Sequence, residues 1–227
     1  MILNQNKINI FYEDDLILIV DKPPKMLSHP DKLHKEPDLL SALKHPEYAV
    51  ITRLDFNTSG LVLLGKSQKS ISILNQLSRN NEIHKIYQCL VLNYFQNPEA
   101  ILTAYLLKDE INSVVRLSDK KIENGQKIIT SYKVLTEKNN CSLLEVELIT
   151  GKTHQIRAHM AFAEHPLIGD PLYGQKSLNK KYNLHFQALV STKIWFTIQD
   201  STNPLFYLNK LLFEKKDTNL MALIDKR

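Results

Sequence analysis

The chain has 227 residues, of which 43% are hydrophobic and 23% are charged, and this composition excludes a disordered or collagen-like protein. A formal charge of +5 favours a polyanionic partner only weakly, because a uniformly solvated basic surface explains it equally well. The two cysteines, Cys89 and Cys141, form no C-x-x-C pair and indicate small core residues of a cytoplasmic protein rather than disulfide partners.

Three elements are predicted in the first third of the chain. Residues 16–20 form a buried strand that is far too short to span a bilayer and that ends at 21–24, where two prolines interrupt a ladder. Residues 27–47 are expected to be irregular, with one short helix. A second short buried strand is expected at 61–64, and apolar residues at helical spacing predict a helix over 68–79.

The middle of the chain predicts strands. Residues 85–92 alternate roughly between apolar and polar side chains. Two further strands, 128–135 and 142–149, flank a polar turn at 137–140 and so predict a hairpin.

The last third mixes a helix, a loop and a strand. Gly151 breaks the chain, and a helix is expected to begin near Thr153, a suitable N-cap residue. Two prolines and two glycines predict a loop at 165–174, followed by a strand near 193–198 and a helix near 204–214. Because the elements do not alternate strictly as β-α-β, we expect an α+β fold with a mixed, largely antiparallel sheet and flanking helices. We find no domain boundary and expect a single catalytic domain over 1–227.

A polar, turn-rich segment at 52–60 precedes the apolar strand 61–64. It places one carboxylate, Asp55, two residues from the cation of Arg53. The simpler interpretation is that Asp55 caps a turn by accepting hydrogen bonds from nearby backbone N–H groups.

The segment 151–160 is the second candidate region. On a helix that begins near Thr153, His154 and Arg157 share a face whereas Gln155 points elsewhere. The helix N-terminus also offers N–H groups to a phosphate or carboxylate. The simpler interpretation is a solvated first turn above a buried apolar face.

Together these segments resemble the RluA-type pseudouridine synthases. The similarity covers roughly residues 10–200 and rests on motifs in the family's order. These motifs are Asp21-Lys22-Pro23-Pro24 with His29-Pro30, residues 53–65, Lys85-Ile86-Tyr87, residues 151–160 with the loop 165–174, and Leu184-His185 with Ala188-Leu189.

The resemblance implies a role for each matching residue. Asp55 matches the catalytic aspartate, and Arg53 matches an arginine that helps occupy the space of the flipped base. Tyr87 matches the tyrosine that stacks on the target ring. Arg157 matches a basic residue that pairs with the aspartate and would keep a buried carboxylate ionised.

Three further residues in these motifs, Lys85, His154 and Gln155, are expected to bind the substrate. One departure is Thr52, where the family usually has His, although a threonine hydroxyl can still bond a backbone group. The opening motif begins within about ten residues of Met1, so we expect a stand-alone catalytic domain without an N-terminal RNA-binding module.

The implied reaction isomerises uridine to pseudouridine in structured RNA, without redox change, and no cofactor or metal is expected. A carboxylate can act there as nucleophile or base. The expected partner is a stem-loop of 23S rRNA or tRNA, recognised by local shape, and the default expectation is a monomer. Two lysine clusters, Lys120, Lys121 and Lys127, and Lys176, Lys180 and Lys181, are the candidates for phosphate contacts.

Two other functions compete with this interpretation. Residues 60–67 match the phosphate-loop pattern G-x-x-x-x-G-K-[ST], which would indicate a nucleotide hydrolase, although four apolar inner residues suit a core better than a phosphate cradle. A non-catalytic RNA-binding protein on the same fold is the second alternative, and the intact Asp55, Tyr87 and Arg157 argue against it.

Overall fold

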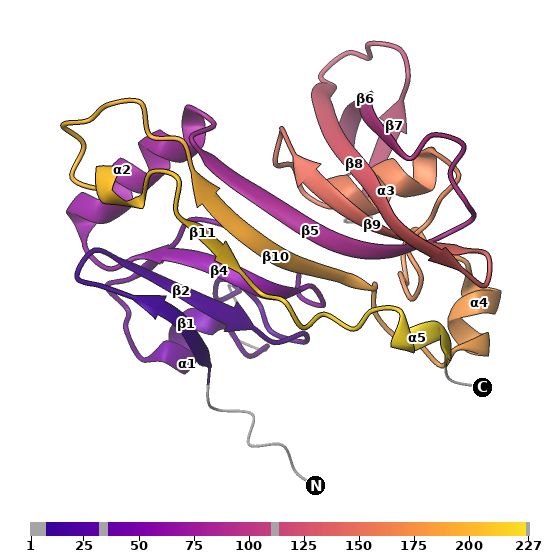
Figure 1. The fold of residues 1–227 in the computed structure, drawn as a ribbon, viewed down its shortest axis with the longest axis horizontal. Coiled ribbons are helices and arrows are strands. Elements are labelled where there is room, and N and C mark those ends of the chain that lie inside the picture. The colour runs from indigo at the N-terminus through magenta and orange to yellow at the C-terminus, as the bar shows by residue number, and fades with distance from the viewer. Residues whose placement is uncertain (1–7, 32–35, 110–113, 226–227) are drawn as a thin grey trace, which may run out of the picture. The chain divides into compact units, whose positions relative to one another are not determined.

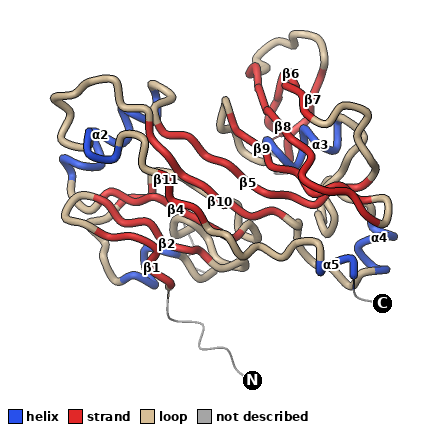
Figure 2. The backbone as a smooth tube through the Cα atoms, viewed as in Figure 1, coloured by secondary structure: helices blue, strands red, loops and turns tan. Residues whose placement is uncertain are grey.

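The computed structural model describes residues 8–31, 36–109 and 114–225. They divide into two compact units. Unit 1 is drawn from residues 1–84 and 191–216, and unit 2 from residues 85–190 and 217–227. Figure 1 labels the helices and strands, and Figure 2 shows that strands form most of the regular structure. The α+β class with a largely antiparallel sheet is therefore confirmed, whereas the single catalytic domain stays a prediction.

Unit 1 is built on a sheet of long and short strands. Its order is β1 (Asn9–Glu13), β2 (Ile17–Lys22), β4 (Ser59–Gly65) and β10 (Leu189–Phe196), with β3 (Ala49–Val50) beside β4 and β11 (Leu212–Glu214) beside β10. β2 and β4 are antiparallel in a register that pairs Ile19 with Leu63. Both strands are buried along almost their whole length, as their continuous apolar runs predict. The predicted strands 16–20 and 61–64 are confirmed.

The helices of unit 1 follow local signals. In α2 (Gln68–Arg79), the Ser67 hydroxyl accepts from the Ser70 N–H and the Ser70 hydroxyl accepts from the Ser67 N–H, which makes a capping box. Leu74 and Leu77 face the core. The helix predicted over 68–79 is confirmed, and α1 (Leu39–Leu43) is the short helix expected within 27–47.

The helix predicted near 204–214 is wrong. This segment holds one 3-10 turn, η1 (Phe206–Leu208), and then the strand β11, which pairs antiparallel with β10. The Asn209 side chain accepts a hydrogen bond from the Ile198 N–H, and Phe213 enters the unit 1 core. Pairing with a distant strand and burial of Phe213 outweigh the local helical periodicity.

Unit 2 is built on a second run of strands. Their order is β5 (Ile83–Leu92), β9 (Cys141–Leu148), β8 (Gln126–Lys138), β6 (Glu99–Asp109) and β7 (Val114–Ser118), and each of the four neighbouring pairs is antiparallel. Asn139 and Asn140 turn β8 into β9 with φ of 54° and 58°, values typical of a type I′ hairpin turn. The predicted hairpin is confirmed, with a tighter turn than expected.

The described part of unit 2 also contains the helices α3 (Gln155–Phe162), α4 (Lys176–Lys181) and α5 (Ala222–Asp225). α3 packs against β7 and β8 (Figure 1). Cys89 and Cys141 are both buried, as predicted for small core residues. Among the described residues, no helix is long and apolar enough to cross a membrane.

Candidate active site

Asp55 lies half-buried in the loop that leads into β4, in unit 1. Its two neighbours in the chain are fixed by hydrogen bonds. The Ser28 hydroxyl donates to the Leu54 carbonyl at 2.8 Å and accepts from the Leu54 N–H at 2.9 Å. The Met26 N–H donates to the Phe56 carbonyl at 3.1 Å. The opening motif thus holds the backbone on both sides of Asp55.

Lys22, at the end of β2, is the buried cation of this region. Its side chain is fully buried, and its Nζ donates to the carbonyls of Pro23, Met26 and Phe56 at 3.0, 2.8 and 3.3 Å. Burial lowers the pKa of Lys22 to about 8, and the nearby Asp55 carboxylate opposes this shift. Sequence analysis assigned no separate role to this lysine, although an ionisable residue at the end of an apolar strand was a usable signal.

The residues just before Asp55 differ in exposure. Thr52 is buried, and its hydroxyl accepts a hydrogen bond from the Leu63 N–H at 2.8 Å, which confirms that threonine can bond a backbone group here. Arg53 is exposed. Burial lowers the pKa of His29, the cation of Arg53 lowers it further, and Asp38 opposes both effects. Arg53 therefore lies electrostatically close to the opening motif.

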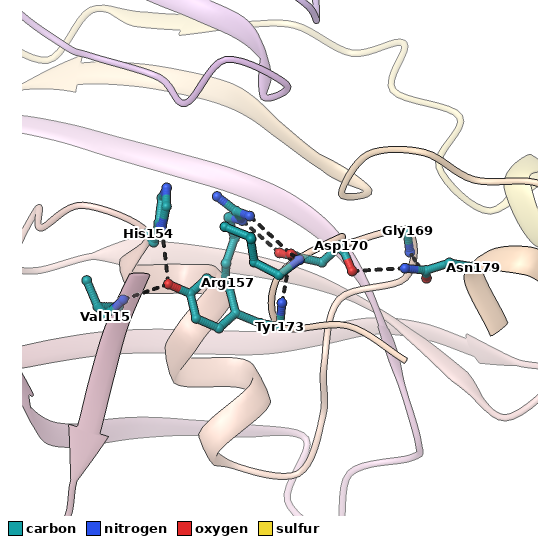
Figure 3. A network of polar contacts seen from close by, with 8 residues as sticks. Val115, His154, Arg157, Gly169, Asp170, Tyr173 and Asn179 are labelled. Atoms are coloured by element: carbon teal, nitrogen blue, oxygen red, sulfur yellow. Dashed lines mark hydrogen bonds and ion pairs between the residues drawn. The ribbon is translucent and has the colours of Figure 1, made fainter. Parts of the chain in front are cut away.

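In unit 2, Arg157 of α3 forms a buried ion pair with Asp170 of the loop 165–174 (Figure 3). Nε donates to Oδ2 at 2.7 Å and Nη2 donates to Oδ1 at 3.0 Å, a bidentate arrangement. Asp170 Oδ1 also accepts from the N–H groups of Leu172 and Tyr173. The sequence placed Asp170 in a loop but did not identify it as a partner of Arg157. Pairing of Arg157 with Asp55 stays a prediction.

The N-terminus of α3 corrects the predicted cap. The N-cap is His154, not Thr153, and it makes no side-chain cap bond. His154 adopts a left-handed conformation with φ of 56°, so it lies outside the helix and does not share a helical face with Arg157. Its Nδ1 lies 3.1 Å from the Tyr173 hydroxyl, which accepts from the Val115 N–H at 2.9 Å (Figure 3).

The Gln155 side chain is buried and engaged with protein atoms. Its Oε1 accepts from the Thr150 hydroxyl and the Lys152 N–H, and its Nε2 donates to the Ile129 carbonyl and the Thr130 hydroxyl. The two Nε2 bonds tie the start of α3 to β8, and the two Oε1 bonds tie it to the segment that precedes the helix. They favour a structural role for Gln155, whose binding to substrate stays a prediction.

Lys85 and Tyr87 lie two residues apart on β5, so their side chains project from the same face of the strand. Tyr87 is buried, with 5% of its surface exposed. Burial lowers the pKa of Lys85, and its Nζ lies close to Gly151. The Lys-x-Tyr motif thus places a half-buried lysine and a buried tyrosine on one face of β5 in unit 2.

The predicted site residues thus fall into two groups. Arg53 and Asp55 belong to unit 1, whereas Lys85, Tyr87, His154, Gln155 and Arg157 belong to unit 2. The lysine clusters are exposed at Lys120, Lys121, Lys127, Lys176 and Lys180, while the Lys181 side chain is outside the described part of the structure.

Comparison with known proteins gives a consistent answer. The family model described as RNA pseudouridylate synthase matches residues 16–162. An uncharacterized RNA pseudouridine synthase of Mycoplasma genitalium is 32% identical over 96% of this chain and 70% of its own length. Ribosomal large subunit pseudouridine synthase C of Vibrio vulnificus is 31% identical over 86% of this chain and 63% of its own length.

Solved structures agree on the fold. Human RNA pseudouridylate synthase domain containing 1 superposes with a TM-score of 0.73 at 19% identity, over 97% of this chain and 96% of that one. The chain therefore belongs to the RNA pseudouridylate synthase family, with RluA-type relatives, and its members are isomerases that convert uridine to pseudouridine in RNA.

Proposed function

We propose that this chain isomerises specific uridines in a structured rRNA or tRNA, and that Asp55 is the essential carboxylate. The observation that supports this most is the fixed loop around Asp55. Ser28 and Met26 bond its neighbours, and the buried ammonium of Lys22 lies electrostatically close to it. A carboxylate that only capped a turn would not require a buried cation, whose desolvation is costly.

The reaction conserves the atoms of the nucleoside. The N1–C1′ bond of uridine breaks, the base rotates, and a C5–C1′ bond forms. The proton on C5 leaves and N1 acquires a proton, so uridine and pseudouridine are isomers. Asp55 serves either as nucleophile at the ribose or base ring, or as a base.

The target base must leave its stack to reach a carboxylate, at a cost of roughly a few kcal/mol. Stacking on Tyr87 returns about 1–3 kcal/mol, and Arg53 is proposed to occupy the vacated space. Tyr87→Phe keeps the stacking ring and removes the hydroxyl. Full activity of that variant would exclude a proton-transfer role for Tyr87.

Arg157 is proposed to hold Asp55 as well as Asp170. Its Nε and Nη2 donate to the Asp170 carboxylate. Because Arg157→Met alone would leave Asp170 buried and unpaired, the test compares Asp170→Asn with the double variant Arg157→Met/Asp170→Asn. We expect only the double variant to lose turnover, and equal turnover of the two would contradict the pairing.

The decisive experiment is tritium release from RNA labelled at uridine C5. Total tRNA and a 23S rRNA transcript are assayed separately, with Asp55→Asn as the control. Release by the native chain but not by the variant supports both the reaction and Asp55, and the responsive RNA identifies the substrate class. RNA binding without release from either RNA would favour a non-catalytic RNA-binding protein.

The structure argues against the nucleotide-hydrolase alternative, because the segment that matches the phosphate-loop pattern is part of a buried strand. Residues 60–65 lie within β4, and Leu61–Leu64 are fully buried with their backbone paired to β2. A phosphate loop needs exposed backbone N–H groups. Absence of ATP and GTP binding is the expected result. The cytoplasmic location and the monomeric state stay predictions.

A further inference from the structure

Unit 2 contains a pocket of about 330 Å³, close to the lower end of the range for small-molecule sites. Its walls come from the paired strands β6 and β7, the turn into β8, and the loop before α3. Six lining residues carry the argument that follows: Leu106, Lys108, Val115, Asn124, Gln126 and Lys152.

The chemistry of these walls suits a nucleotide. Lys108 and Lys152 bring two cations, and none of the described lining residues is acidic, so the walls favour a phosphate. Asn124 and Gln126 offer amide donors and acceptors of the kind that bind base edges. Leu106, Val115 and other apolar lining atoms give a heterocycle a surface to contact.

Hydrogen bonds connect this pocket to the candidate active site within unit 2. The Val115 N–H, from the pocket wall, donates to the Tyr173 hydroxyl, which lies 3.1 Å from His154 Nδ1 (Figure 3). The Arg157 guanidinium lies 5.3 Å from the centre of the Tyr173 ring. A wall of the pocket is therefore two contacts away from Arg157.

We propose that this pocket binds one nucleotide of the substrate RNA other than the target uridine. Its phosphate contacts Lys108 and Lys152, and its base contacts Asn124 and Gln126. This inference rests on the proposed function, because it identifies part of the RNA-binding surface of the same enzyme. It also explains why the exposed residues Lys120, Lys121 and Lys127 flank the turn that carries Asn124.

The test measures the equilibrium binding of total tRNA and of a 23S rRNA transcript in an Asp55→Asn background, in which the proposed function predicts no turnover. One fewer phosphate contact lowers the salt slope by about 0.7–0.9, which corresponds to about five- to eightfold weaker binding at 0.1 M salt. We expect this change for Lys152→Ala. The matched control is Lys133→Ala, which removes an exposed lysine of β8 that does not line the pocket. We expect it to bind like the background protein.

A second measurement tests for the base itself. RNA containing 4-thiouridine is photo-crosslinked to the same protein, and crosslinked peptides are mapped by mass spectrometry. We expect crosslinks within 106–108, 124–126 or 152–153. Binding by Lys152→Ala equal to that of Lys133→Ala, or crosslinks confined to other segments, would overturn the proposal.

The two proposals fail separately. Tritium release by the native chain together with normal RNA binding by Lys152→Ala would remove only the pocket. Weaker binding by Lys152→Ala, with pocket crosslinks but no tritium release, would retain the pocket and remove the isomerase activity proposed for Asp55.

Discussion

Burial of Lys22 should make the stability of the protein depend on pH above pH 8. In the folded protein its pKa is about 8, whereas the ordinary value is 10.5. Between these values the unfolded chain binds a proton that the native state has lost. The free energy of unfolding therefore rises with pH through this window. Below pH 8 the lysine is charged in both states, and above pH 10.5 it is neutral in both.

The size of this effect follows from the two pKa values. At about 1.4 kcal/mol for each pKa unit, the difference between 10.5 and about 8 corresponds to about 3 kcal/mol. Solvent screening does not reduce this free energy, because the Lys22 side chain is fully buried. The matched variant is Lys22→Met, which has a similar length and does not titrate.

The assay is urea unfolding at several pH values from 7 to 10.5. The signal is the fluorescence of Trp195, the single tryptophan, which stacks on His84 in unit 1, the unit that contains Lys22. Subtracting the Lys22→Met stability at each pH removes the contributions of the other titrating groups. The native protein should gain about 3 kcal/mol on the variant across this range. A difference that does not change with pH would refute the reasoning.

Three further substitutions test local contacts by thermal unfolding. Gly60→Ala should destabilise the protein strongly, because the φ of Gly60 is +111° and a Cβ would overlap main-chain atoms of β10. The control Gly151→Ala should be tolerated, because its Cβ would meet only the flexible end of a side chain. Equal melting temperatures of the two variants would contradict this. Asp170→Asn removes the carboxylate charge from the buried, bidentate pair with Arg157 and should cost about 3–5 kcal/mol, so an unchanged melting temperature would show that the pair is not stabilising. Thr52→Val leaves the Leu63 N–H without its acceptor, at a cost of about 1–3 kcal/mol that Thr52→Ser should avoid; similar losses in both variants would exclude the hydroxyl as the cause.

Much of the fold could be predicted because its signals are local. The apolar runs of β2 and β4, the capped helix α2 and the β8–β9 hairpin each carry their pattern within a few residues. The weaker strands β6 and β7 were not predicted. Few of their residues are fully buried, and the burial of Ala104, Leu106 and Val115 depends on packing with Ile128 of β8 and Ala158 of α3.

The ordered motifs, with Asp55 at their centre, were enough to predict the family. Tertiary structure decided the rest, because the deciding contacts join segments far apart in the chain. Pairing with β10 converted the predicted helix near 204–214 into β11. The Gln155 amide, rather than Thr153, anchors the start of α3 through its hydrogen bonds to β8. The buried Lys22 donates to the Phe56 carbonyl, 34 residues away in the chain. Arg157 pairs with the Asp170 carboxylate, 13 residues away. Residue spacing by itself does not specify such partners.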